Sequence, residues 1–275
     1  MKFMVTLLQV LILSSLFQSK GGLALQSQGN WLFIGDSHSV RGFGDGLRET
    51  LFESRGDLEE RFYQYSISGS RAVHWMDGSF VELSVNWAKK VPGMLKEVVA
   101  GSVGDRVLSF PELNRQKKPT HLIIALGTND SIYHAMNIKR LGSKGKNLAL
   151  EQEQVLETNL SSMRNLLNEN ATALCALVLP PLLLIKALPQ SLHQKYTDEL
   201  KKIGEKRGCL IIDSRLIRDA PGKKVNHWQD CLISDSMGEG SLPIRPDQND
   251  GVHFFKAKGE YWGRCAALLI QETWK

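Results

Sequence analysis

Short apolar runs recur along the chain and alternate with longer stretches whose apolar residues have helical spacing. Runs that are apolar at nearly every position are typical of strands buried on both faces, as in parallel sheets. Parallel strands need crossover connections, and the helices in these connections cover the two faces of the sheet. We therefore predict an α/β fold with a five-stranded parallel sheet. The predicted strands are Trp31–Ile34, Phe62–Ile67, His121–Leu126, Ala173–Leu179 and Cys209–Ile212.

The helical pattern repeats apolar residues at intervals of three and four, which places them on one face of a helix. The predicted helices are Glu151–Leu167, Ser191–Lys206 and Ala257–Trp274, with a shorter one around Leu47, Leu51 and Phe52. Two connections are long: Arg71–Thr120, in which we expect a helix over Val91–Val99, and Ser214–Asn249, which is rich in Gly, Pro, Asp and Asn. Long loops at the active edge of a sheet commonly shape a ligand groove.

Polar and small residues follow the predicted strands at the point where each strand ends. In open α/β sheets the ligand binds outside the carboxyl ends of the strands. The segments at these positions are Gly35-Asp36-Ser37-His38-Ser39, Ser68-Gly69-Ser70, Gly127-Thr128-Asn129-Asp130 and Pro180-Pro181, with Asp250-Gly251-Val252-His253 between the last strand and the last helix. The sequence therefore predicts that these segments meet in one site.

Ser37, His253 and Asp250 have the side chains that nucleophilic catalysis requires. A serine hydroxyl is a weak nucleophile until a positioned base takes its proton, and His253 is the candidate base. Asp250 precedes His253 by three residues and can accept the Nδ1 proton, which fixes the tautomer and stabilises the imidazolium formed during attack. The spacing allows this arrangement, and we predict it.

Acyl transfer also needs hydrogen-bond donors for the oxyanion of the tetrahedral intermediate. Gly69 has no side chain, so its N–H can come close to a substrate. The amide of Asn129 can donate into the same space, and the N–H of Ser37 makes a third donor.

These segments, taken together and in this order, resemble the SGNH hydrolases, also called GDSL esterases. The family is named for Ser, Gly, Asn and His in four separate blocks, which are matched here by Ser37, Gly69, Asn129 and His253. The resemblance extends from about Trp31 to the C-terminus. It implies a flavodoxin-like, three-layer α/β/α fold, the roles given above, and no metal or organic cofactor.

One position departs from the family pattern, because His38 stands where the family usually has leucine. A Gly-Asp-Ser-His block resembles SGNH domains that act on acetyl groups of cell-surface carbohydrate. We expect His38 and Asp36 to contact substrate. For Asp36 and Asp130 the alternative is that their carboxyl groups hold two loops together through hydrogen bonds.

Residues 1–24 have the pattern of a secretory signal peptide. Lys2 precedes an apolar run from Phe3 to Phe17, and Gly22 and Ala24 provide small residues before a cleavage point. An uncleaved membrane anchor is the alternative, but the run is short and has polar breaks. We expect a secreted or periplasmic protein whose residues 25–275 form one hydrolase domain, with no stable membrane span after cleavage.

The charge of the chain does not indicate a nucleic-acid partner. The formal net charge is +5, and removal of Lys2 and Lys20 leaves +3, with the positive residues scattered along the chain.

The sequence contains four cysteines and no CxxC pair, so a zinc site is not expected. In an exported chain they allow up to two disulfides, and the pairing is left open. Cys175 and Cys209 lie in apolar runs and fit buried thiols. Cys231 lies in a loop-like region and is the one we most expect to be bridged, while Cys265 falls in the last predicted helix.

The sequence thus predicts an exported serine esterase that acts through an acyl-Ser37 intermediate. Its expected substrate is an acylated glycan or small ester. Among these we favour an O-acetyl group on an extracytoplasmic glycan or peptidoglycan. Two alternatives remain: a lysophospholipase-like or thioesterase-like member of the same fold, and a glycan O-acetyltransferase or glycan-binding protein. The oligomeric state does not follow from the sequence.

Overall fold

The computed structural model describes residues 29–79, 99–101, 108–142, 148–186, 189–233, 242–248 and 250–274. The expected signal peptide lies outside these residues. So does the expected helix over Val91–Val99, except for Val99, which begins a strand. No helix in the described ranges combines the length and apolar character that crossing a membrane requires.

Among the described residues a six-stranded sheet has the order β3-β2-β1-β4-β5-β6. The strands are β1 (Trp31–Gly35), β2 (Phe62–Ile67), β3 (Val99–Gly101), β4 (His121–Ala125), β5 (Leu174–Leu179) and β6 (Leu210–Asp213). The five strands β2-β1-β4-β5-β6 are all parallel to one another. This confirms the predicted α/β fold and its five parallel strands. Their order is that of flavodoxin-like sheets. The antiparallel edge strand β3 was not predicted, because three residues are too few to show a pattern.

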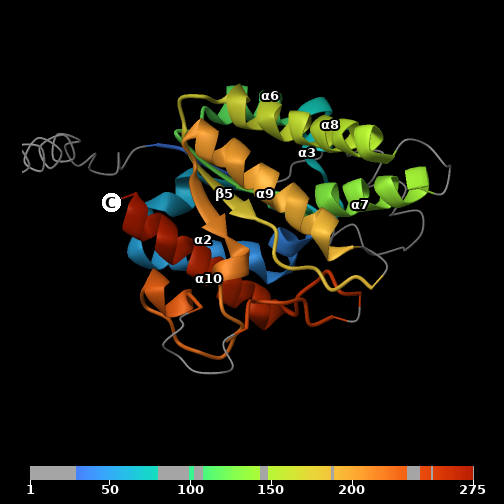
Figure 1. Cartoon of the computed structure of the whole chain (residues 1–275). Coiled ribbons are helices and arrows are strands. Elements are labelled where there is room, and N and C mark those ends of the chain that lie inside the picture. Colours follow the sequence, from blue (N-terminus) through green and yellow to red (C-terminus); the bar gives the residue numbers. More distant parts are fainter. Residues whose placement is uncertain are drawn as a thin grey trace, which may run out of the picture.

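Helices cover both faces of the sheet, as Figure 1 shows. One face packs against α2 (Gly44–Ser54) and α10 (Lys256–Thr273), with Phe33 and Trp262 in the shared core. The other face is covered by α3 (Ala72–Asp77), α6 (Phe110–Lys117), α8 (Leu148–Glu169) and α9 (Gln190–Arg207), and α7 (Thr128–Gly142) packs against α8 and α9. The helices expected in the second half of the chain are confirmed as α8, α9 and α10.

The helix that follows β1 lies unusually close to the last helix of the chain. A Cβ atom on Gly46 of α2 would lie 2.0 Å from the backbone oxygen of Glu260, and one on Gly263 of α10 would lie 2.0 Å from that of Phe43. Only glycine allows two helix backbones to approach in this way. The contact brings the start of the domain, including Ser37, against its end, including His253.

Two disulfides, Cys175–Cys209 and Cys231–Cys265, use all four cysteines of the sequence. The expectation that Cys175 and Cys209 are buried thiols is wrong, because β5 and β6 are neighbours in the sheet and bring the two side chains together. The bridge at Cys231 was expected, and it ties the 3₁₀ turn η4 (Trp228–Cys231) to α10. Isolated antiparallel β-bridges pair Ile217 with Leu232 and Arg218 with Pro243 in the described parts of the long segment after β6, for which no regular pattern was expected.

Candidate active site

Ser37 lies where β1 gives way to a helix. The N–H of Asp36 still bonds to the carbonyl oxygen of Ala125 on β4, and its carboxylate accepts the N–H of His38 at 3.0 Å. Asp36 therefore caps the helix that begins at Ser37. The next turn is a π-helix, η1 (Ser39–Phe43), an irregularity that often occurs at functional sites.

A chain of hydrogen bonds joins Ser37, His253 and Asp250. The Nε2 atom of His253 lies 2.9 Å from the Ser37 hydroxyl oxygen, and its Nδ1 atom lies 2.5 Å from Oδ2 of Asp250. With Nδ1 protonated and donating to the carboxylate, Nε2 is free to accept the serine proton. Ser37 itself is only 2% exposed, so its hydroxyl lies within the walls of the site.

Asp250 remains ionised in this arrangement. Its other oxygen accepts the N–H groups of Val252 and His253, both at 2.9 Å. Burial raises the pKa of Asp250, but the hydrogen bond from the His253 ring and those two N–H groups outweigh it and lower the pKa to about 2. Asp250 is thus a carboxylate at neutral pH.

Gly251 gives the turn between Asp250 and His253 its shape. Its φ is +71°, a value that residues with a side chain rarely adopt, and a Cβ atom there would meet the backbone of Leu184 at 2.7 Å. The carbonyl oxygen of Gly251 accepts the N–H of Leu184 at 2.8 Å. The turn that presents His253 is therefore clamped to the segment that follows β5.

Gly69 and Asn129 lie on adjoining loops. Gly69 has a φ of +77°, and one amide hydrogen of Asn129 is donated to the carbonyl oxygen of Ser70 at 3.1 Å. This bond orients the Asn129 amide and leaves its second hydrogen available. The N–H groups of Ser37 and Gly69 are the other two oxyanion donors that the sequence predicts.

Asp36 and Asp130 are buried beneath these loops. Both oxygens of Asp130 lie within 3.3 Å of the N–H of Ala72, which fixes the loop that contains Gly69, and Asp36 bonds to the side chain of Thr128 besides His38. Burial raises the pKa of each carboxyl group to about 7, although the hydrogen bonds lower it. The nearby Asp130 raises the pKa of Asp36 further. The contacts agree with the loop-holding alternative.

Asp36 and His38 were expected to contact substrate, but the structure buries both side chains. Asp36 is 1% exposed, and its described contacts are all within the protein. The ring of His38 is 3% exposed and packs between the rings of Phe254 and Trp262, behind His253. His38 thus supports His253 from the core side.

His193 is a buried contact of the site that was not predicted from the sequence. Its two ring nitrogens lie 2.9 Å from the Ser131 hydroxyl and 2.8 Å from the carbonyl oxygen of Pro181. It therefore ties the loop after β5 to α7. Its position three residues before Tyr196 and seven before Leu200 places it on the apolar face of the predicted helix, and this spacing is the sequence signal that could have found it.

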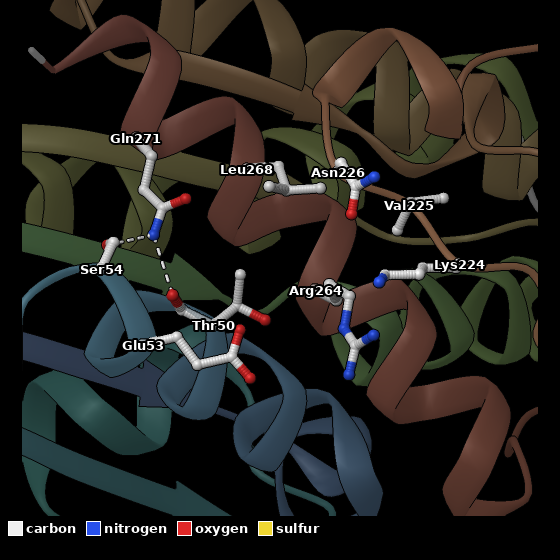
Figure 2. A pocket seen from close by; sticks show the side chains of 9 residues that line it. All are labelled: Thr50, Glu53, Ser54, Lys224, Val225, Asn226, Arg264, Leu268 and Gln271. Atoms are coloured by element: carbon white, nitrogen blue, oxygen red, sulfur yellow. Dashed lines mark hydrogen bonds between the residues drawn. The ribbon is translucent and has the colours of Figure 1, made fainter.

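A separate pocket of about 460 Å³ lies between α2, α10 and the loop at Lys224 (Figure 2). Thr50 and Ser54 line it from the far end of α2, and Gln271 donates to both of them. None of Ser37, Asp250 and His253 lines this pocket. Among the residues the structure describes, no group of three His, Cys, Asp or Glu side chains is placed to hold a metal ion.

Comparison with known proteins gives one family. The model of the family "GDSL-like Lipase/Acylhydrolase" matches residues 32–257. No curated protein matches the chain significantly.

Solved structures of two esterases and of an α/β hydrolase are similar over most of the chain. The esterase EstA from Pseudoalteromonas sp. is 18% identical, with 90% of this chain and 98% of that chain covered and a TM-score of 0.46. The acetylxylan esterase Axe2 from Geobacillus stearothermophilus is 17% identical, with 91% and 96% covered and a TM-score of 0.47. The α/β hydrolase LAE5 from the metagenome of Lake Arreo is 15% identical, with 88% and 96% covered and a TM-score of 0.47.

Proposed function

Because the chain belongs to the GDSL-like lipase/acylhydrolase family and is an ester-hydrolysing enzyme, we propose that Ser37 is its nucleophile, His253 its general base and Asp250 the group that orients His253. The observation that carries this proposal is the pair of hydrogen bonds from His253, at 2.9 Å to Ser37 and 2.5 Å to Asp250. This is the geometry of a nucleophile, a base and an orienting carboxylate.

The reaction proceeds in two steps. The Ser37 oxygen attacks the carbonyl carbon of the ester while Nε2 of His253 takes the hydroxyl proton, and the C–O bond to the alcohol then breaks as His253 returns that proton to the leaving oxygen. His253 next takes a proton from water, whose oxygen attacks the acyl-Ser37 ester. Collapse of this second intermediate releases the acid and restores the serine.

The N–H groups of Ser37 and Gly69 and the second amide hydrogen of Asn129 stabilise the oxyanion in both steps. Each such donor typically contributes a factor of about 10²–10³ to the rate. The bonds of Ser70 to Asn129 and of Ala72 to Asp130 support this role, because they fix the donors before substrate arrives.

The proposed substrate is an O-acetyl group on an extracytoplasmic glycan. The low exposure of Ser37 favours a small acyl group, and the Gly-Asp-Ser-His block resembles domains that act on carbohydrate acetyl groups. Export is supported by the signal-like residues 1–24 and by the two disulfides, which persist in oxidising compartments. Residues 25–275 are proposed as the mature hydrolase.

A lipid-directed or thioester-directed esterase is the second candidate. Leu184, which bonds to Gly251, is 47% exposed, and Phe255, two residues after His253, is 61% exposed. Exposed apolar side chains on both sides of His253 could hold a longer acyl chain. Acetyl transfer to an acceptor sugar would use the same acyl-Ser37 intermediate with the sugar hydroxyl in place of water.

Hydrolysis of p-nitrophenyl esters of increasing acyl length by residues 25–275 tests these proposals. We expect acetate to be the best substrate and Ser37→Ala to lose activity, while Ser54→Ala, which changes an exposed serine of α2, retains it. A maximum at long acyl chains would favour the second candidate. Release of p-nitrophenol only in the presence of an acceptor sugar, with the acetyl group recovered on that sugar, would favour transfer. Equal rates in the Ser37→Ala variant would refute the nucleophile.

A further inference from the structure

Arg71 and Tyr133 form a stacked pair at the surface. The guanidinium carbon of Arg71 lies 3.8 Å from the centroid of the Tyr133 ring, and Tyr133 is 42% exposed. The backbone N–H and one guanidinium nitrogen of Arg71 also lie 3.1 Å from the two ring nitrogens of His74. These contacts hold a long and otherwise mobile cationic side chain in one place.

The pair lies beside the proposed oxyanion donors. Arg71 follows Gly69 by two residues, and Asn129, which donates to Ser70, precedes Tyr133 by four residues on α7. Residues four apart share a face of a helix, at about 6 Å along its axis. The Arg71–Tyr133 pair therefore lies about the width of one sugar ring from an ester bound at Gly69 and Asn129.

Within the part of the chain that the structure describes, no ion pair with a carboxylate matches the charge of Arg71. Its guanidinium contacts the ring and the hydroxyl of Tyr133 and the ring of His74. His74 is uncharged at neutral pH, because burial and the nearby Arg71 lower its pKa to about 4. Asp130 acts on Arg71 only through space, and its oxygens are occupied by the N–H of Ala72. Donors of the guanidinium edge thus remain for a ligand.

We propose that the Arg71–Tyr133 pair selects the substrate by binding a carboxylate on its alcohol part, so that the enzyme prefers O-acetyl esters of acidic sugars. The inference rests on the proposed function in one respect: an acetyl group has no charge, so the carboxylate belongs to the alcohol. A planar guanidinium held by an aromatic ring is well suited to a carboxylate, because its fork of N–H donors matches the two oxygens. The exposed Tyr133 ring adds an apolar surface beside it.

Two acetate esters that differ in one charge test this inference. Hydrolysis of 4-acetoxybenzoate, which is anionic, is compared with that of its neutral methyl ester, in the wild type and in Arg71→Gln. We expect kcat/KM for the anionic ester to fall about tenfold more than kcat/KM for the neutral ester, as for loss of a charge-assisted hydrogen bond. Lys117→Gln is the matched control, because Lys117 also stacks on a tyrosine, Tyr63, which lies near the amino end of β2, whereas Arg71 follows its carboxyl end.

Equal losses on the two esters in Arg71→Gln would overturn the inference and make Arg71 a support of the Gly69 loop. A binding measurement separates this result from failure of the proposed function. NMR titration of Ser37→Ala with 4-acetamidobenzoate, which cannot be hydrolysed as an ester, should show tighter binding than with its methyl ester, and Arg71→Gln should remove the difference. If binding depends on Arg71 but the wild type hydrolyses neither ester, the inference is retained and the esterase function is refuted. If the wild type hydrolyses the neutral ester and shows no preference for the charged one, the esterase function is retained and the inference is refuted.

Discussion

The Nε2 atom of His253 lies 2.9 Å from the hydroxyl oxygen of Ser37, although 216 residues separate them in the sequence. The close approach of α2 and α10 through Gly46 and Gly263 explains this distance, because the helical turns that start at Ser37 continue through η1 into α2, and α10 begins three residues after His253. The geometry of the site therefore depends on how two helices pack, as well as on the loops that contain the reactive groups.

Asp250→Asn is expected to lower kcat by about 10³–10⁴ without unfolding the protein. Asparagine can occupy the same space, but its amide neither stabilises an imidazolium nor reliably selects the tautomer with a free Nε2. Steady-state kinetics with p-nitrophenyl acetate measure the effect, and Asp45→Asn on α2 is the control for loss of a carboxylate. A change of less than about tenfold would mean that another group, such as a backbone carbonyl, orients His253.

Gly251→Ala is expected to reduce kcat by about 10²-fold with a smaller effect on stability. The new Cβ meets the backbone of Leu184, and alanine disfavours the positive φ, so the turn must shift and move His253 away from Ser37. Gly222→Ala is the matched control, because a Cβ at Gly222 meets nothing within 4 Å. Activity equal to that of the control would show that the turn can relax without moving His253.

The parallel sheet and the grouping of Ser37, His253 and Asp250 could be predicted because both have local signatures. Buried parallel strands are apolar at nearly every position, and reactive residues follow their ends. The bridge between Cys175 and Cys209 had no such signature, because it depends on β5 and β6 being neighbours. The same holds for the contacts of His193 and Arg71, which arise from packing between elements distant in the sequence.

The orientation of His38 and Asp36 shows a different limit of the sequence. Both stand next to Ser37, and proximity in the chain suggested contact with substrate. The helix that begins at Ser37 turns the ring of His38 into the core against Trp262, and Asp36 becomes the cap of that helix. Sequence neighbours of a nucleophile thus point in different directions once a helix starts.

The buried carboxyl groups of Asp36 and Asp130 are expected to make the fold less stable as the pH rises. Burial raises each pKa to about 7, so between about pH 4 and pH 7 the folded protein binds protons that the unfolded chain has released. Their contribution to the free energy of unfolding is therefore largest below about pH 4 and declines as the pH approaches 7.

Asp130→Asn tests this expectation, because asparagine can still accept the N–H of Ala72 but does not ionise. Urea unfolding at about pH 5 and about pH 7.5 should show a smaller loss of stability in the variant than in the wild type. An equal loss in the two proteins would show that Asp130 does not bind a proton in the folded state over this range.

Each disulfide is expected to stabilise the protein by roughly 3–4 kcal/mol, because it closes a loop that is long in the unfolded chain. Both pairs have a sequence separation of 34. Denaturant unfolding of the double variant Cys231→Ala/Cys265→Ala, compared with the oxidised wild type, measures the effect. Detection of free thiols in the oxidised, denatured protein would contradict the pairing itself.

The most direct test of the central claim is to trap the nucleophile with a fluorophosphonate and locate the adduct by peptide mass spectrometry. The account predicts one adduct per chain, on Ser37, formed in step with the loss of esterase activity and greatly slowed in His253→Ala, since the base that activates the hydroxyl is missing. Inactivation with the adduct on another residue, or with Ser37 unmodified, would contradict the assignment of Ser37 as the nucleophile.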